Sequence, residues 1–335
     1  MIEVKVSTNF AHWPLARQTP RGAGEWGGCR FLVNQEVEAC DFWVVLDGFG
    51  GPETVRCHPS NTLLVTCEPP DVKTYAPEFL RQFAVVLTSH RKLHHPHVLH
   101  GQQGLPWMIG ARLEPASLTW TNFMSFEEIE RYSVEKRRLL SIVASRDKVT
   151  RGHAARNRFI EELKRTLGDR VDVFGLGYMP IGDKLDAIGP YRYHVAIENS
   201  CVADYWTEKL ADAYLGRAFP IYSGCPNLSA YFPTGSYEPI DIGDPAAAVQ
   251  RVEEIISSNI DLNRRSKVLE ARRRVLHAHN LFAVLATLIG DLRQTGHERP
   301  GPLTLRPESP AAQGTVSKRS PAMELLARYA RRWRR

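Results

Sequence analysis

The run of residues 191–224 has the clearest pattern of apolar and polar positions in the chain. Apolar side chains alternate with polar or small ones up to Glu198, which predicts a strand that ends there. Apolar residues then recur at helical spacing from Asp204, a residue type that caps helices, to Gly216, a residue type that ends them. A second strand is predicted over 218–222. We therefore expect a strand–loop–helix–strand unit, of the kind that builds parallel sheets and binds ligands at the carboxyl ends of its strands.

Similar apolar runs on both sides of this unit predict an α/β protein with two domains. Strands are expected over 2–6, 41–46, 61–66, 83–88, 139–144 and 171–174, and helices over 76–82, 156–167, 245–258 and 262–292. A charged helical stretch over 127–136 separates the two groups of strands, so we place the domains at 1–136 and 137–294. With 335 residues, of which 43% are hydrophobic, the chain is long enough to bury two cores.

The last segment, 295–335, differs in composition from the rest of the chain. Its Pro, Gly, Ser and Thr content up to Pro321 predicts a disordered linker. Residues 318–335 contain seven basic residues and one acidic residue, which leaves 36 basic and 36 acidic residues elsewhere, so the net charge of +6 belongs to this tail. A short helix there would separate apolar from basic side chains, which suits an anionic membrane surface. A disordered solubilising tail is the alternative.

Several function classes are disfavoured by composition. No run is long and apolar enough to span a membrane, and the body of the chain has no basic excess that would indicate nucleic-acid binding. Six cysteines occur without a CxxC pair, which favours a reducing compartment over a zinc site or a disulfide framework. The histidine-rich loop 89–97 has metal-ligand chemistry, but Pro96 breaks helical presentation and no acid or cysteine lies nearby. We therefore prefer a cationic, hydrogen-bonding rim and expect no metal site.

Polar residues at predicted strand ends are the candidates for chemistry. In the central unit they are Glu198, Asn199, Tyr205, Glu208 and Lys209. Glu68 follows the strand 61–66 and is held by Pro69 and Pro70; a solvated turn residue is the ordinary alternative. Ligand clefts open at strand ends, which favours the functional interpretation of this carboxylate.

A basic cluster surrounds the loop after the predicted strand 139–144. Its members are Arg146, Lys148, Arg151 and Arg156. Guanidinium groups and helix N-terminal amides there are suited to phosphate oxygens, although a solvated face is an equally good interpretation. The Gly175-Leu176-Gly177 run is better interpreted as a structural turn than as a phosphate loop. For Trp107 core packing is the default, with stacking on a sugar as the alternative.

The central run resembles the signature of the α1,3-fucosyltransferase family. The matching segments are 193–200, 204–209, 213–214 and 220–224, which read YHVAIENS, DYWTEK, AY and PIYSG. A fainter likeness extends from Leu139 to Ala246 and includes Arg156-Asn157. In the first half only Glu68-Pro69-Pro70 resembles a family feature, an acidic-Ser-Pro element in which proline replaces serine.

The resemblance implies a GT-B-like fold, in which two Rossmann-type domains face each other across a cleft, and a GDP-fucose donor with no metal or other cofactor. Lys209 and Arg156 would neutralise the diphosphate, and Glu208 would bond ribose or fucose hydroxyls. Asn199 and Tyr205 would line the donor site together with Glu198. Family members of this type invert the anomeric centre and need a general base, for which Glu68 is the candidate and Glu198 a competitor.

We therefore expect an inverting transferase that moves fucose from GDP-fucose to a hydroxyl of a glycan acceptor. The expected product is an α1,3-linkage to a GlcNAc-type sugar of a surface polysaccharide or lipopolysaccharide. The first domain would bind the acceptor and the second the donor, with the basic tail holding a cytoplasmic enzyme on the inner face of the membrane. Where the family has an acidic element after the fourth strand, this chain has His94-His95-Pro96-His97. Another nucleotide-sugar donor, or a catalytically silent nucleotide- or carbohydrate-binding protein, are the alternatives.

Overall fold

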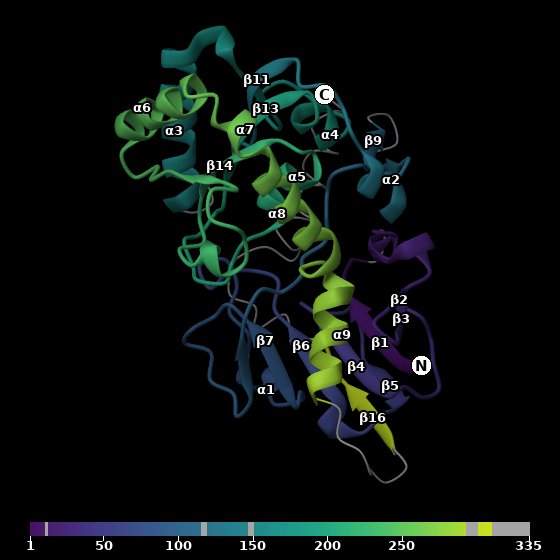
Figure 1. Cartoon of the computed structure of the whole chain (residues 1–335). Helices are drawn as coiled ribbons and strands as arrows, with labels where there is room; N and C mark the ends of the chain where they lie inside the picture. Colours follow the sequence, from purple (N-terminus) through teal and green to yellow (C-terminus); the bar gives the residue numbers. More distant parts are fainter. Residues whose placement is uncertain (11–12, 115–118, 147–150, 293–300, 310–335) are drawn as a thin grey trace. The chain divides into compact units, whose positions relative to one another are not determined.

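The computed structural model describes residues 1–10, 13–114, 119–146, 151–292 and 301–309. The chain divides into two compact units (Figure 1). Unit 1 comprises Met1–Pro106 and the described residues from His279 onward, and unit 2 comprises Trp107–Ala278. Each unit contains its own parallel sheet, which confirms the predicted α/β class with two Rossmann-type domains.

These units differ from the predicted domain bounds, 1–136 and 137–294. The segment after Trp107 belongs to unit 2 because the backbone amides of Met108 and Ile109 donate to Asp212 there. Helix α9 (Leu281–Leu292) belongs to unit 1, where Phe282 packs edge-on against Phe31 with ring centroids 5.0 Å apart. Within the described residues, the chain therefore crosses between the units twice.

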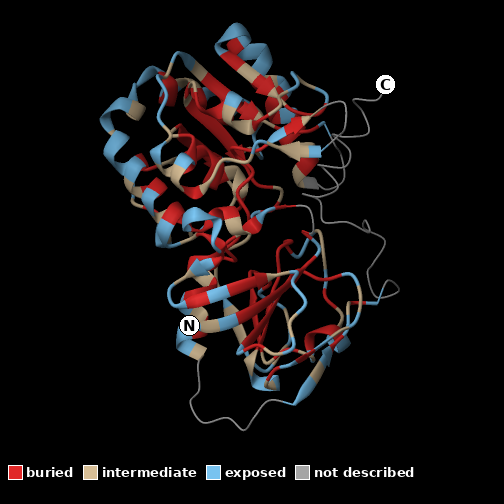
Figure 2. Ribbon diagram, turned by 90° about the vertical axis from the view of Figure 1, so that its right-hand side faces the viewer, coloured by how far each residue is buried: buried red, intermediate tan, exposed pale blue. Residues whose placement is uncertain are grey.

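The sheet of unit 1 has seven strands in the order β2-β3-β1-β4-β6-β7-β8. Their bounds are β1 Ile2–Thr8, β2 Glu25–Trp26, β3 Cys29–Val33, β4 Phe42–Leu46, β6 Thr62–Val65, β7 Val85–Thr88 and β8 Val98–His100. All neighbouring pairs are parallel except β2 with β3. Every residue of β4, β6 and β7 is buried, because continuous apolar runs suit strands covered on both faces. Figure 2 shows buried residues, in red, concentrated on the strands inside the units.

Part of the predicted linker is a strand of unit 1. Strand β16 (Pro302–Leu305) pairs antiparallel with β5 (Glu53–Arg56), and Leu305 is buried in the core beside α1 (Pro77–Leu80). Glu308 follows and accepts a hydrogen bond from the Ala76 amide at 2.7 Å. Residues 301–309 are therefore part of the folded unit, while the predicted basic helix over 318–335 lies outside the described residues.

The sheet of unit 2 has five parallel strands in the order β12-β11-β13-β14-β15. Their bounds are β11 Arg138–Val143, β12 Val171–Phe174, β13 Tyr191–Ile197, β14 Phe219–Ser223 and β15 Glu238–Pro239. A small hairpin of β9 (Arg112–Glu114) and β10 (Thr119–Thr121) and the helix α2 (Phe126–Arg131) precede them. The predicted strands 139–144 and 171–174 are thus confirmed.

Helices connect and cover this sheet. They are α3 Arg151–Leu167, α4 Lys184–Ile188, α5 Glu208–Leu215, α6 Pro245–Ser257, α7 Ile260–Asn263 and α8 Arg265–His277. From β11 the chain passes through α3 to β12 on one side, and from β13 through α5 to β14 on the other. Because such crossovers are right-handed, α3 and α5 lie on opposite faces, and the sheet changes direction between β11 and β13. Ligands of open parallel sheets bind at this switch point.

Two helix predictions need correction. Helix α5 begins at Glu208 with Thr207 as its N-cap, not at Asp204. Asp204 has left-handed backbone geometry, φ 66°, and its carboxylate accepts hydrogen bonds from Asn227 and Tyr231, both at 2.6 Å. The long helical run predicted over 262–292 is broken into α7, α8 and α9, because the backbone leaves helical geometry near Arg264 and again after His277.

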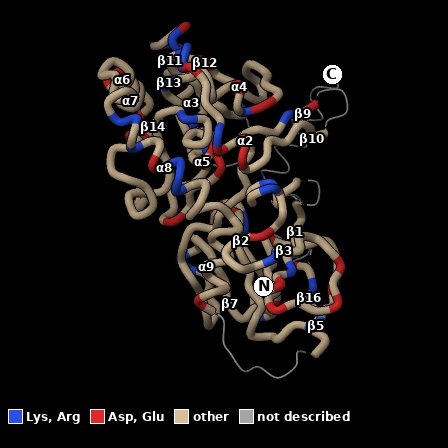
Figure 3. Tube along the Cα trace, turned by 45° about the vertical axis from the view of Figure 1, so that its right-hand side comes forward, with Lys and Arg blue, Asp and Glu red and all other residues tan. Residues whose placement is uncertain are grey.

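Charged side chains of both signs are spread over the chain. Figure 3 shows Lys and Arg interspersed with Asp and Glu over the parts of the chain it colours. Among the described residues, none of the helices is by itself long and apolar enough to cross a membrane. Only α8 and α9 taken together, bent by 61°, meet that criterion of length and composition.

Candidate functional site

The end of β13 and the start of α5 bring together the polar residues of the central unit. The Glu198 amide donates to Ser223 O at 2.8 Å, so this residue continues the pairing of β13 with β14 for one position beyond the strand. Thr207 caps α5 by accepting a hydrogen bond from the Lys209 amide. Glu198 and the first turn of α5 therefore meet at the carboxyl edge of the sheet.

Glu198 points inward and anchors this cap. Its Oε1 accepts from the Thr207 amide and its Oε2 from the Thr207 hydroxyl, both at 2.8 Å. Burial raises the pKa of this carboxyl, and the nearby Lys209 ammonium opposes the rise. A Cβ at Gly224 would lie 2.5 Å from Glu198 Cγ, so only glycine leaves room for the side chain. Both carboxylate oxygens are occupied, which argues against Glu198 as the competing base.

Lys209 and Glu208 form the exposed edge of the same cluster. Lys209 Nζ lies 3.3 Å from Glu208 Oε1, 3.5 Å from Glu198 Oε2 and 3.2 Å from the Thr207 hydroxyl. The Lys209 side chain is 23% exposed and that of Glu208 15%, so neither side chain faces open solvent. Burial opposes the charge of Lys209, but Glu208 and Glu198 outweigh it and raise the pKa of the ammonium. Lys209 is therefore a fixed cation at neutral pH.

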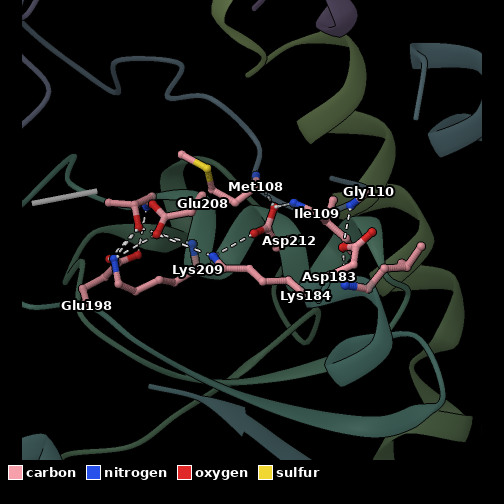
Figure 4. A network of polar contacts seen from close by, with 11 residues as sticks. Met108, Ile109, Gly110, Asp183, Lys184, Glu198, Glu208, Lys209 and Asp212 are labelled. Atoms are coloured by element: carbon pink, nitrogen blue, oxygen red, sulfur yellow. Dashed lines mark hydrogen bonds and ion pairs between the residues drawn. The ribbon is translucent and has the colours of Figure 1, made fainter. Parts of the chain in front are cut away.

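Two further charged residues, which the sequence reasoning missed, extend the cluster (Figure 4). Lys184, the first residue of α4, lies 3.7 Å from Glu208 Oε1 and 3.0 Å from Asp212 Oδ2. Burial would raise the pKa of Glu208, yet Lys209 and Lys184 together lower it to about 2. One signal was present in the sequence: Asp212 is an acid inside the apolar run 210–215, where an unpaired carboxylate would be costly.

Arg156 and Asn199 meet on the other side of β13. Arg156 comes from α3, and its Nη1 donates to Asn199 Oδ1 at 2.8 Å. Its Nη2 donates to the backbone oxygen of Ser145, at the end of β11, at 3.0 Å. Arg156 therefore lies at the switch point between β11 and β13.

The remaining members of the predicted basic cluster are placed differently. Arg146 lies over the ring of Tyr178, with its guanidinium carbon 4.8 Å from the ring centroid. Lys148 and the side chain of Arg151 lie outside the described parts of the chain. Of this cluster, the described side chains thus bring only Arg156 into the candidate site.

Tyr205 and Ser200, which follow Asn199 within six positions of the sequence, are both buried. Tyr205 is buried, and its amide donates to Val202 O at 3.2 Å. The buried Ser200 Oγ finds no hydrogen-bond partner among the described residues. A buried hydroxyl without a partner is unusual in a folded protein. Ser200 is a third residue that sequence reasoning did not assign to the site.

Glu68 lies in unit 1, at the carboxyl end of β6, as predicted. It is buried, and its backbone oxygen bonds His90 Nε2 at 2.8 Å. The neighbouring amide of Cys67 donates to Asp47 Oδ1 at 3.2 Å, and Asp47 pairs with Lys73 at 3.0 Å. Glu68 thus belongs to an ordered polar loop rather than to a solvated turn. Its role as a base opposite the residues of unit 2 stays a prediction.

The histidine-rich loop and Trp107 lie outside the polar cluster of Glu198, Glu208 and Lys209. His95 bonds the backbone oxygen of Phe83 at 3.0 Å, and Trp107 is almost fully buried, as its default interpretation requires. In the described part of the chain, no three His, Cys, Asp or Glu side chains gather closely enough to hold a metal ion.

Comparison with known proteins places the site within a matched segment. Residues 134–260 match the model for the C-terminal part of glycosyltransferase family 10 (fucosyltransferase). Alpha-(1,3)-fucosyltransferase 4 of Rattus norvegicus is 32% identical over 118 residues, which cover 33% of this chain and 27% of that protein. A 4-galactosyl-N-acetylglucosaminide 3-alpha-L-fucosyltransferase of Pongo pygmaeus is 36% identical over 84 residues, which cover 24% of this chain and 23% of that protein.

Solved structures show similarity over more of the chain at lower identity. A crystal structure of an α1,3-fucosyltransferase with GDP-fucose covers 82% of this chain and 90% of its own, with 16% identity and a TM-score of 0.44. A trehalose-phosphate synthase from Burkholderia vietnamiensis covers 76% of this chain and 72% of its own, with 10% identity and a TM-score of 0.46. The sequence match carries the assignment: the predicted resemblance to the α1,3-fucosyltransferases is confirmed over residues 134–260, which match the C-terminal part of glycosyltransferase family 10.

Proposed function

We propose that this chain is a glycosyltransferase that moves fucose from GDP-fucose to a hydroxyl of a glycan acceptor. The observation that carries the proposal is the pair of fixed cations, Lys209 and Arg156, at the carboxyl edge of the sheet in unit 2. In such a transfer the bond between the sugar carbon C1 and the phosphate oxygen breaks, and GDP leaves with the electron pair. Preorganised cations beside the leaving diphosphate stabilise that charge in the transition state.

The other residues of the site have roles that fit this chemistry. Glu208, which the two lysines keep ionised, is an acceptor for donor hydroxyl groups. Asn199 and Ser200 follow directly on the end of β13, and among the described residues the Ser200 hydroxyl has no hydrogen-bond partner, so it can bond a ligand; Tyr205 is proposed to line the donor site with them. Cations and helix N-terminal amides supply the leaving-group stabilisation, so the proposal needs no divalent metal.

The finer parts of the proposal concern stereochemistry and acceptor. The acceptor oxygen attacks C1 opposite the leaving group with inversion, and Glu68 takes the acceptor proton. The support for Glu68 is its burial at a strand end in an ordered polar loop. The names of the matched relatives support an α1,3-linkage to a GlcNAc-type sugar as the product. A surface polysaccharide or lipopolysaccharide is the acceptor that we propose.

Release of GDP tests the proposal. The full chain is incubated with GDP-fucose and an N-acetyllactosamine-type acceptor, and free GDP and glycan mass are followed. We expect GDP release that depends on the acceptor and a product heavier by one deoxyhexose. Tight GDP binding without transfer to any acceptor would favour a silent binding protein, and transfer from a different nucleotide sugar in preference to GDP-fucose would contradict the donor assignment.

A further inference from the structure

Glu208 faces two lysines that come from different helices. Lys209 is its neighbour in α5, with Nζ 3.3 Å from Glu208 Oε1. Lys184 opens α4 and places its Nζ 3.7 Å from the same oxygen. The proposed transfer assigns the diphosphate to Lys209 and leaves Lys184 without a role.

Lys184 is held in place by a network of buried groups (Figure 4). Its Nζ donates to Asp212 Oδ2 at 3.0 Å, and Asp212 Oδ1 accepts from the amides of Met108 and Ile109. Asp183, the N-cap of α4, accepts from the Gly110 amide at 3.0 Å. The lysine is thus fixed by contacts with α4, with α5 and with the segment 108–110. A surface lysine without a function does not need such a network of buried polar groups.

The charge balance of the cluster shows what Lys184 contributes. Three carboxylates, Glu198, Glu208 and Asp212, lie around the two lysines. Without Lys184, the Lys209 ammonium would be the single cation that offsets the negative charges of both Glu198 and Glu208. A cation that is already saturated by carboxylates attracts a phosphate less strongly, because each nearby negative charge opposes the incoming one.

We propose that Lys184 is a positioning residue that offsets the charge of Glu208 and so keeps the Lys209 ammonium available for the nucleotide diphosphate. The inference rests on the proposed function and deepens it, because it assigns a second lysine to the donor site. Lys184 acts through Glu208 and does not itself contact the substrate.

Binding of GDP and of guanosine separates this role from a structural one. Lys184→Gln keeps a hydrogen-bond donor for Asp212 but removes the charge, and it should weaken GDP binding about tenfold while changing guanosine binding less than about twofold. Lys184→Arg should restore GDP binding. Equal losses for GDP and guanosine, or no loss for GDP, would overturn the inference. Isothermal titration calorimetry of the full chain measures both ligands.

A double-mutant cycle tests whether Lys184 acts through Glu208. In a Glu208→Gln background, Lys184→Gln should change GDP affinity less than about twofold, because residue 208 then has no negative charge beside Lys209 for Lys184 to offset. Additive losses would show that Lys184 acts on the phosphates directly and would overturn the proposal. If Lys184→Gln fails to fold, the Lys184→Gln/Asp212→Asn variant leaves no buried acid unpaired and should show the same selective loss of GDP binding.

GDP binding by the wild type and by Lys184→Gln distinguishes a failure of the proposed function from a failure of this inference. A wild-type chain that binds no GDP would overturn the proposed function and this inference with it. A wild-type chain that binds GDP, with a Lys184→Gln variant that binds it equally well, would overturn only the inference.

Discussion

Single side chains set the electrostatics of the candidate site. Glu198 is buried with both oxygens on Thr207, and Glu208 and Lys209 sit at the edge of the same cluster. The sequence predicts that these residues lie together, because the end of the strand and the start of the helix are separated only by a short loop. Lys184 and Asp212 were not predicted as site residues. Their contact joins α4 and α5, and the packing of two helices cannot be inferred from a local sequence pattern.

Substitution of Lys209 tests its proposed role at the leaving group. Lys209→Ala should lower kcat/KM for GDP-fucose by about 100-fold or more, because a charge-assisted contact to the departing diphosphate is lost. Lys267→Ala, which removes an exposed lysine of α8, is the matched control and should keep wild-type kinetics. Steady-state assays of GDP release compare the three proteins, and full activity of Lys209→Ala would remove this lysine from the mechanism.

Substitution of Glu68 tests the base. Glu68→Gln should reduce kcat by about 100-fold or more and leave GDP affinity within about twofold, because the amide cannot accept the acceptor proton. The bond from His90 goes to the backbone oxygen of Glu68, so the loop keeps that contact in the variant. Glu36→Gln, at an exposed position of unit 1, is the control. A large loss of GDP affinity would instead make Glu68 a donor-binding residue.

At the scale of elements, prediction succeeded where the pattern is long and continuous. The strands β4, β6 and β11–β13 follow apolar runs, and their bounds deviate from prediction by at most a few residues. The start of α5 was misplaced because Asp204 resembles an N-cap, while its carboxylate is bound to Asn227 and Tyr231 in the folded unit. Strand β16 was missed because a short strand in a proline-rich run is stabilised by its partner β5 and not by its own propensity.

The buried strand β13 contains a titratable residue whose behaviour can be measured. Burial lowers the pKa of His194 to about 3, and its Nδ1 is 2.8 Å from the Ser141 hydroxyl. In the unfolded chain this imidazole has an ordinary pKa near 6.5, so between about pH 6.5 and pH 3 the unfolded state binds a proton that the folded state does not. The contribution of His194 to stability is therefore fully present above about pH 6.5 and is lost as the pH falls toward 3.

This residue should therefore contribute to acid sensitivity. From pH 7 to pH 5 the contribution of His194 corresponds to a loss of about 2 kcal/mol in the free energy of unfolding. Urea denaturation at both pH values, on the wild type and on His194→Gln, isolates the effect, since the variant removes one titrating group and keeps a polar side chain. The loss between the two pH values should be smaller in the variant. An identical pH dependence for both proteins would show that His194 is not responsible.

At the scale of the whole molecule, two parallel-sheet units account for the chain that the structure describes. Their number and class could be predicted from alternating apolar runs, whereas the crossings at Pro106 and His279 could not. Those crossings depend on contacts such as Met108 with Asp212 and Phe282 with Phe31, which join segments far apart in sequence. The arrangement of the units across a cleft and the membrane role of the tail stay predictions.

Deletion of residues 318–335 tests the membrane role of the basic tail. The truncated chain should no longer sediment with vesicles that contain anionic lipid, because the seven basic residues of the tail are lost, and should keep full activity on a soluble acceptor. The full chain with neutral phosphatidylcholine vesicles is the control for charge dependence. Continued sedimentation of the truncated chain with anionic vesicles would contradict the anchor.

A crystal structure of the full chain with bound GDP would locate the leaving diphosphate. We expect the diphosphate within hydrogen-bonding distance of Lys209 Nζ and the Arg156 guanidinium, at the carboxyl edge of the sheet in unit 2. GDP bound elsewhere on the chain, with Lys209 still paired only to Glu198 and Glu208, would contradict it.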